Sequence, residues 1–187
     1  MKILCFGDSN TYGFDPRSFF GEQYAPEIRW TGRLAQVSDW DIIDAGQNGR
    51  EIPCSSYEYS ALRQIVGYYS PDLLILMLGT NDLLNGCTAE EAAQRMETCL
   101  TALSADSVLL IAPVPLQLGA WVPSEQLIAE SRKLSALYRT LAERHGIAFA
   151  DAGEWNVELL FDGVHFSERG HAAFAAGLHH TLKKHFG

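Results

Sequence analysis

Ser9 is the side chain of this sequence that is best placed to act as a nucleophile. It lies in GDSNTYG (residues 7–13), directly after an apolar run over Lys2–Phe6. A serine between the end of a strand and the start of a helix is held rigidly, and its backbone N–H points outward, where it can stabilise an anion. Gly, Asp, Ser and Asn are also turn formers and helix N-caps, so a purely structural corner is the alternative.

His165 is the candidate base for this serine, because a serine hydroxyl is a weak nucleophile until a base accepts its proton. It lies in FDGVHF (residues 161–166), and Asp162 precedes it by three residues. That spacing lets the carboxylate accept a hydrogen bond from Nδ1, which leaves Nε2 free to accept a proton. The remaining histidines fit ordinary helix faces and ends, and their spacing predicts no metal site: His145, His171, His179, His180 and His185.

Two further loops offer hydrogen-bond donors for the oxyanion that forms during acyl transfer. Asn81 lies in GTND (residues 79–82) and can offer its side-chain amide. Gly49 lies in GQNGR (residues 46–50) and can offer its backbone N–H. Gly46 is the alternative in that loop, but Gly49 lies further beyond the preceding apolar run. Each loop by itself is also explained as a turn; Arg50 and Asp82 flank them.

Five apolar runs of strand length must position these loops. They cover Lys2–Phe6, Asp41–Ala45, Leu73–Leu78, Val108–Ala112 and Ile147–Ala150. Because nearly every position is apolar, we expect strands that are covered on both faces. Segments of helical period lie between them, with start signals at Thr88 and Glu91 (a capping box), Ser124 and Ser167. This alternation predicts one α/β domain over residues 1–187, a three-layer α/β/α sandwich with a mostly parallel, five-stranded, flavodoxin-like sheet.

The expected strand order brings the candidate residues together. In the flavodoxin-like order 2-1-3-4-5, the first strand lies between the second and the third, and ligands bind beyond the carboxyl ends of the strands. Ser9, Gly49 and Asn81 each follow one of these three strands. The sequence therefore predicts that all three converge on one crevice.

Composition narrows the function classes. The chain has 187 residues, 47% hydrophobic and 20% charged, with a net charge of −9, which disfavours nucleic acids and anionic membranes as partners. The absence of a membrane-length apolar run or a signal-peptide pattern predicts a cytoplasmic protein. The cysteines show no paired spacing, so we expect free thiols. Cys5 lies inside an apolar strand, where a catalytic thiolate is disfavoured.

The four separated blocks resemble the SGNH hydrolases, also called the GDSL family. The blocks are GDSNTYG with Ser9, GQNGR with Gly49, GTND with Asn81, and DGVH with Asp162 and His165. The resemblance implies a serine esterase that hydrolyses small carboxylic esters without a cofactor or metal, through an acyl-enzyme on Ser9. His165 would be the general base and Asp162 would orient it. The N–H groups of Ser9 and Gly49 and the Asn81 side chain would form the oxyanion hole.

Two details refine this resemblance. YAPEIRWTGRL (Tyr24–Leu34) is similar to a bacterial arylesterase and acyltransferase branch of the family. Asn10 replaces the leucine of the GDSL name, and Tyr12 stands where that branch often has tryptophan. The loop over residues 113–123 looks shorter than the corresponding loop of that branch. Acyl transfer by this chain is therefore left open, and so is its oligomeric state, a homo-oligomer included.

Substrate contacts are predicted at Tyr12 and Trp121. Trp121 belongs to an apolar loop that would line an acyl or alcohol pocket, together with Val114, Leu116, Leu118 and Val122. A second wall would contain Phe19, Phe20, Tyr24 and Trp30. The alternative for both groups is packing on the sheet or on a second subunit.

Two other functions stay open at this level. One is a carbohydrate O-deacetylase of the same family, in which polar side chains would bind sugar hydroxyls: Tyr12, Asn48, Arg50 and Asn85. The other is a flavodoxin-like module whose GDSNTYG loop binds a phosphate or nucleotide. Asp8 and the lack of a basic residue in that loop oppose the module, and it leaves Asp162 and His165 unexplained.

Overall fold

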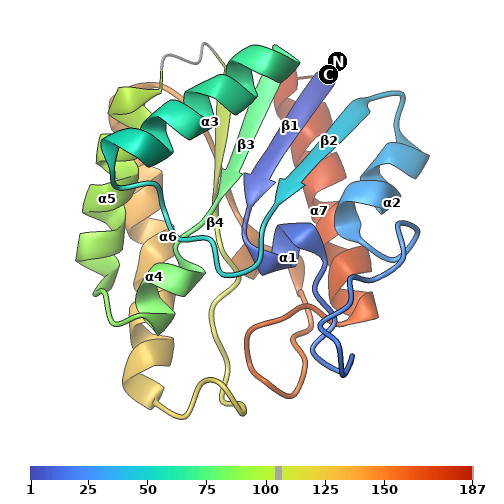
Figure 1. The fold of residues 1–187 in the computed structure, drawn as a ribbon, viewed down its shortest axis with the longest axis vertical. Coiled ribbons are helices and arrows are strands. Elements are labelled where there is room, and N and C mark those ends of the chain that lie inside the picture. Colours follow the sequence, from blue (N-terminus) through green and yellow to red (C-terminus); the bar gives the residue numbers. More distant parts are fainter. Residues whose placement is uncertain (104–106, 187) are drawn as a thin grey trace.

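A five-stranded parallel sheet forms the centre of the protein. The computed structural model describes residues 1–103 and 107–186. The strands are β1 (Lys2–Gly7), β2 (Asp41–Gly46), β3 (Leu73–Met77), β4 (Val108–Ala112) and β5 (Ala148–Asp151). Their order across the sheet is β2-β1-β3-β4-β5, and every pair is parallel. The predicted α/β fold and its strand order are therefore confirmed, and the carboxyl ends of all strands meet at one edge (Figure 1).

Helices cover the sheet on both faces. They are α1 (Ser9–Tyr12), α2 (Trp30–Val37), α3 (Ser56–Tyr69), α4 (Thr80–Leu84), α5 (Ala89–Ala102), α6 (Glu125–His145), the 3-10 helix η1 (Ala152–Trp155) and α7 (Glu168–Phe186). Figure 1 shows α3, α4, α5 and α6 on one side of the sheet and α2 and α7 on the other. Within the described ranges, no helix combines the length and the apolar character that crossing a membrane requires.

Each face of the sheet has its own core, because successive strand residues point to opposite faces. On β1, Leu4 and Phe6 pack toward the side of α3, α5 and α6. Ile3 and Cys5 pack toward α2 and α7. All four side chains are buried. Because the residues on both faces of β1 are buried and apolar, the sequence shows a continuous apolar run instead of an alternation of apolar and polar residues.

The edge strand β2 corrects the expectation that all five strands are covered on both faces. Asp41 and Asp44 are exposed, and the other residues of β2 are half-buried. Ile43 packs partly against one core and Ile42 partly against the other. The strand is apolar because it contacts both layers, but as an edge strand it has a neighbour on one side only.

The predicted helix starts are mostly those of the structure. Thr88 and Glu91 form a capping box at α5. Ser167 precedes α7, and its hydroxyl accepts a hydrogen bond from Gly170 N at 3.0 Å. Ser124 precedes α6 but caps no backbone N–H with its side chain. A second capping box, Ser55 with Glu58 at α3, was not predicted.

His171 on α7 is a buried neutral histidine whose titration destabilises the fold in acid. Burial lowers its pKa from 6.5 to about 3, and its Nδ1 accepts a hydrogen bond from Trp30 N at 3.3 Å. Between these two pKa values the unfolded chain binds the proton and the folded chain does not, so stability falls as the pH drops below about 6.5. From pH 6.5 to pH 5 this one group should remove roughly 2 kcal/mol of unfolding free energy.

Urea unfolding of the wild type and of His171→Gln at both pH values measures this effect. We expect the variant to lose less unfolding free energy on acidification than the wild type. The difference should be roughly the 2 kcal/mol that titration of His171 contributes. His180→Gln, at an exposed position of the same helix, is the matched control and should retain the wild-type pH dependence. Equal acid sensitivity of the wild type and His171→Gln would contradict the assignment.

Candidate active site

Ser9 lies directly beyond the carboxyl end of β1, at the first residue of α1 (Figure 1). Asp8 is the N-cap of this helix, and its side chain accepts a hydrogen bond from Asn10 N at 2.9 Å. Ser9 is 6% exposed. As the first residue of a helix, Ser9 has a backbone N–H without an intrahelical acceptor. The expected corner between strand and helix is therefore present, and the Ser9 N–H has no acceptor among the described residues.

The structure brings Ser9, His165 and Asp162 into one hydrogen-bonded row. The Ser9 Oγ lies 3.0 Å from His165 Nε2, and His165 Nδ1 lies 2.7 Å from Asp162 Oδ2. Asp162 Oδ1 accepts hydrogen bonds from Val164 N at 2.9 Å and from His165 N at 3.0 Å. All three members of the row are buried. The carboxylate therefore fixes both the ring and the backbone of the histidine.

Asp162 is held as a carboxylate. Burial alone would raise its pKa, but the hydrogen bonds from the His165 ring and from the His165 and Val164 backbone outweigh burial, and the pKa lies below its ordinary value. A charged Asp162 keeps the proton on Nδ1 and leaves the Nε2 lone pair directed at Ser9.

Asp8 is the second buried carboxyl group near Ser9. Burial raises its pKa to about 6, although the hydrogen bond from Asn10 N and the charges of His165 and Arg50 act in the opposite direction. Its described side-chain contact is the cap of α1. This contact agrees with the expectation that Asp8 stabilises the loop over residues 7–13 and takes no part in the chemistry.

Asn10 connects the two ends of the chain in a way that the sequence analysis missed. Its Nδ2 donates to Val164 O at 3.1 Å, and its Oδ1 accepts from Phe166 N at 3.0 Å. These two bonds grip the backbone on both sides of His165. The sequence signal was the asparagine itself, because it replaces an apolar leucine with a side chain that can donate and accept at once.

The loops after β2 and β3 also meet, as expected. Asn81 Nδ2 donates one hydrogen bond to Arg50 O at 3.0 Å, and an amide nitrogen has a second N–H to offer. Gly49 adopts φ +71°, a left-handed conformation that suits glycine. Its N–H has no acceptor among the described residues. Both donors are therefore available to a ligand.

Gly46, the alternative donor in the second loop, is already committed to the fold. Its N–H donates to Asp44 Oδ1 at 2.9 Å. A Cβ at this position would lie 2.1 Å from Tyr12 N, so the glycine allows α1 to pack against the end of β2. These contacts support Gly49 as the free donor.

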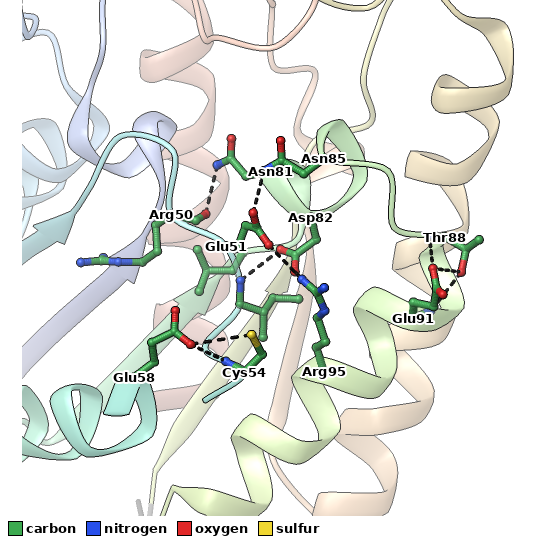
Figure 2. Close-up of polar contacts among 12 residues, drawn as sticks. Arg50, Glu51, Cys54, Glu58, Asn81, Asp82, Asn85, Thr88, Glu91 and Arg95 are labelled. Carbon is green, nitrogen blue, oxygen red and sulfur yellow. Dashed lines mark hydrogen bonds and ion pairs between the residues drawn. The ribbon is translucent and has the colours of Figure 1, made fainter. Parts of the chain in front are cut away.

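A network of charged and amide side chains fastens the loop after β2 to α4 and α5 (Figure 2). Asp82 accepts hydrogen bonds from Ile52 N at 3.0 Å and from Arg95 at 2.9 Å. Arg95 also contacts Glu51 at 2.9 Å, and Asn85 donates to Glu51 at 2.6 Å. Burial raises the pKa of Asp82, while its backbone and Arg95 partners act against that shift. Asp82 is therefore a bracing residue for the second and third loops.

Two aromatic rings flank the imidazole of His165. The Phe14 ring centroid lies 4.8 Å from it, and the Trp121 centroid lies 5.1 Å away with the ring planes at 84°. Trp121 is 53% exposed. An exposed aromatic ring beside the candidate base is available to contact an apolar substrate group.

The loop over residues 113–123 is divided between core and surface. Leu116 and Val122 are buried in a small core with residues that include Val164, so packing is the correct interpretation for these two. Leu118 and Trp121 are exposed. The loop is fastened to the histidine segment by backbone bonds, among them Trp121 N to Asp162 O at 3.1 Å.

The second predicted wall is wrong for two of its members. Tyr24 and Trp30 are buried side chains; Trp30 packs against the α7 side of the core. Trp30 also donates through its Nε1 to Asn10 O at 3.0 Å. Phe19 and Phe20 are exposed and contact each other edge to face, with ring centroids 5.2 Å apart. Tyr12 lies on α1, three residues after Ser9, and is half-buried.

A parallel α/β sheet with a serine, an imidazole and a carboxylate in hydrogen-bond contact at its carboxyl edge is the arrangement of a serine hydrolase. Over the described ranges, no group of three or more His, Cys, Asp or Glu side chains is arranged to hold a metal ion.

Comparison with known proteins agrees with this class. Residues 5–173 match the family described as GDSL-like Lipase/Acylhydrolase. The inhibitor-bound aryl esterase of M. smegmatis is 30% identical, with a TM-score of 0.85 and coverage of 98% of both chains. A carbohydrate acetylesterase from Sinorhizobium meliloti is 28% identical, with a TM-score of 0.81 and coverage of 99% of both chains.

A member of the lipolytic protein G-D-S-L family from Veillonella parvula DSM 2008 shares the fold at 19% identity, with a TM-score of 0.77 and coverage of 100% of this chain and 98% of that chain. No curated protein sequence matches the chain significantly. The chain belongs to the GDSL-like lipase/acylhydrolase family. It is an enzyme, a serine hydrolase that acts on carboxylic ester bonds.

Proposed function

We propose that the protein hydrolyses small carboxylic esters through an acyl-enzyme on Ser9. The observation that carries this proposal is the 3.0 Å contact of the Ser9 Oγ with His165 Nε2, together with the 2.7 Å contact of His165 Nδ1 with Asp162. A neutral imidazole in this position accepts the hydroxyl proton as the oxygen attacks the ester carbonyl carbon.

The reaction then proceeds in two halves. In the first, His165 returns the proton to the alcohol oxygen as the bond between the carbonyl carbon and that oxygen breaks, and the acyl group stays on Ser9. In the second, water gives a proton to His165 and attacks the acyl carbon, and the proton returns to the Ser9 oxygen as the acid leaves. Asp162 stabilises the imidazolium in both halves.

Three donors would hold the oxyanion of each tetrahedral intermediate: the N–H of Ser9, the N–H of Gly49 and the side chain of Asn81. They follow β1, β2 and β3, which are neighbours in the sheet. Asn81 is oriented by its bond to Arg50 O. Because preorganised donors need no reorientation when charge develops, they lower the barrier more than solvent does.

Asn81→Ala is expected to reduce kcat by about 100- to 1,000-fold, the range for removal of one oxyanion donor, with a smaller change in KM. The measurement is steady-state hydrolysis of p-nitrophenyl acetate. Gln94→Ala removes an exposed amide side chain from α5 and should retain the wild-type kcat. An Asn81→Ala enzyme within a few-fold of the wild type would remove this residue from the oxyanion hole.

The exposed ring of Trp121 supports small esters with an apolar or aromatic group as substrates. It packs edge to face against the His165 imidazole. Leu118 and Phe161 are also exposed, on the two loops that meet here. The aryl esterase among the similar structures favours the same substrate class. We assign Tyr12 and Trp121 to substrate contact in this proposal.

A carbohydrate O-deacetylase is the second candidate, because one of the similar structures is a carbohydrate acetylesterase. The exposed Asn48 is a polar side chain that could contact a sugar. Initial rates on p-nitrophenyl esters of increasing acyl length, compared with rates on acetylated sugars, separate the two candidates. Faster turnover of aryl esters supports the first, and faster release of acetate from sugars supports the second.

Some expectations from composition stay predictions. These are a cytoplasmic location, a single catalytic domain over residues 1–187, and the absence of nucleic-acid or membrane partners.

Reaction of the enzyme with a fluorophosphonate, followed by mapping of the modified residue, tests the proposal that Ser9 is the nucleophile. The phosphorus–oxygen bond should form at Ser9, with fluoride as the leaving group.

A further inference from the structure

We propose that Arg50 is the positioning residue of the oxyanion hole, because its side chain and its backbone together contact all three segments that carry the donors. This inference rests on the proposed function of Ser9, Gly49 and Asn81. It assigns Arg50 a role in the geometry of the donors and no contact with the reacting atoms.

The guanidinium joins the ends of β1 and β2. Its Nη1 donates to Gly7 O at 2.8 Å and also to Ala45 O, and its Nη2 donates to Gln47 Oε1 at 3.0 Å. Gly7 is the last residue of β1 and lies two residues before Ser9. The side chain therefore fixes the end of the strand from which the nucleophile and its N–H project.

The backbone of the same residue fixes the other two donors. Arg50 O accepts the hydrogen bond from Asn81 Nδ2 at 3.0 Å. Arg50 N donates to Gln47 O at 3.3 Å, which closes the turn that contains Gly49. Figure 2 shows the carbonyl of Arg50 directed at Asn81 while its guanidinium extends the opposite way. Movement of this one residue would displace all three donors relative to one another.

The contacts fit an arginine better than a lysine. Nη1 donates to two carbonyl oxygens while Nη2 donates to the Gln47 amide oxygen, so the planar guanidinium serves three acceptors from two nitrogens held in fixed geometry, which the single ammonium of lysine cannot do. The guanidinium lies 3.9 Å from the centroid of the Phe6 ring, and this stacking further fixes its plane. No carboxylate lies within ion-pair distance of it among the described residues, so Arg50 differs from Arg29 and Arg95, which pair with carboxylates.

Arg50 stays charged despite its burial. Burial lowers its pKa to about 10, and the charges of Asp8 and Asp44 act against that shift. The protein therefore retains a half-buried, partly desolvated cation, whose desolvation costs free energy that an apolar side chain would not cost. The contacts that the Arg50 guanidinium makes with Gly7, Ala45 and Gln47 offset this cost of burying a charge.

A cavity of about 570 Å³ beside Arg50 makes a sharp test available. It is lined by residues that include Phe6, Gly49, Arg50 and Leu62. Removal of the Arg50 side chain would leave a cation-shaped space next to this cavity. A small guanidinium compound added to the solution can enter that space and reproduce the missing contacts.

The experiment compares Arg50→Ala, Arg50→Lys and the control Arg63→Ala on p-nitrophenyl acetate. We expect Arg50→Ala to lower kcat by about 10- to 100-fold, the range found when partners that orient metal ligands are removed, with KM within about two-fold. Arg50→Lys should lie between Arg50→Ala and the wild type. Methylguanidinium at non-denaturing concentrations should raise the kcat of Arg50→Ala several-fold, whereas urea at the same concentration should not.

Arg63→Ala is the matched control, because Arg63 is exposed and its side chain donates, within the described part of the chain, to Ala102 O at 3.2 Å on a different helix. It should retain the wild-type kcat and should not respond to methylguanidinium. If Arg50→Ala fails to fold, Arg50→Lys carries the test through its loss of kcat at unchanged KM. An unchanged kcat in the Arg50 variants, a rise in KM alone, or an Arg50→Ala deficit that methylguanidinium does not relieve would overturn the inference.

Failure of this inference is distinguishable from failure of the proposed function. An inactive Ser9→Ala enzyme beside a fully active Arg50→Ala enzyme would remove only the role of Arg50. A fully active Ser9→Ala enzyme would remove the proposed function itself.

Discussion

Ser9→Ala is expected to lower kcat on p-nitrophenyl acetate by on the order of 10⁶-fold, the loss that follows removal of a serine nucleophile that acts with a histidine base. The reason is the geometry of the row: the Ser9 Oγ lies 3.0 Å from His165 Nε2, the nitrogen that accepts its proton. Without it, no covalent acyl-enzyme forms, and what remains is the contribution of binding and of the oxyanion donors.

The same variant should lose its reaction with a fluorophosphonate. The wild type should carry the phosphonyl group on the peptide that contains Ser9, and the fraction of enzyme molecules labelled should equal the fraction of activity lost. Ser38→Ala is the matched control, because that hydroxyl donates to Leu34 O at 2.7 Å at the end of α2. It should react and turn over like the wild type. Normal turnover by Ser9→Ala would contradict the proposed mechanism at its first step.

The juxtaposition of Ser9 and His165 was predictable although 156 residues separate them. No local pattern links the two. The link comes from topology, because parallel strands place the loops that follow them at one edge of the sheet. The apolar runs identified the strands, and the strand order then placed Ser9, Gly49 and Asn81 beside one another. Fold and candidate row were therefore accessible from residue types and spacing.

The contacts that hold the row were less accessible, because they depend on the direction of single side chains. Asn10 reads as a turn residue in sequence, yet it grips the backbone around His165. Arg50 was expected beside the loops as a side chain that could bind sugar hydroxyls, yet its guanidinium donates to strand-end carbonyls. A pattern of hydrophobic and polar positions gives a residue's face, and it does not specify which of several acceptors a long polar side chain will reach.

The sequence allows two interpretations of the aromatic residues. For Tyr24 and Trp30, a substrate wall and packing are both open, and the structure shows packing. Both side chains are buried against α7: Tyr24 lies on His171, and Trp30, the first residue of α2, lies on Phe174. Trp121 stayed exposed because backbone bonds fasten its loop to the histidine segment at the rim of the site. The sequence alone therefore does not show whether a large apolar side chain near a catalytic motif lies in the core or in a pocket. The conformation of its loop determines which of the two it is.

Asp162→Asn is expected to lower kcat by about 10⁴-fold, through the tautomer of His165. Asn can keep the acceptor that binds Val164 N and His165 N, so the turn should survive. Its amide nitrogen would then face His165 Nδ1 in place of the carboxylate oxygen that lies 2.7 Å away. An N–H facing Nδ1 favours the ring form that carries its proton on Nε2, and that nitrogen can no longer accept the proton of Ser9.

Steady-state kinetics and thermal unfolding, measured on the same preparations, test this argument. The Asn variant should unfold close to the wild-type temperature while its kcat collapses, and its KM should change little. Asp39→Asn, at an exposed position before β2, is the matched control and should affect neither quantity. A kcat within ten-fold of the wild type would mean that the histidine is oriented by its packing against Phe14 and Trp121, with the carboxylate dispensable. A shared loss of stability and activity would instead assign Asp162 to the turn, since the two roles of this carboxylate use different oxygens.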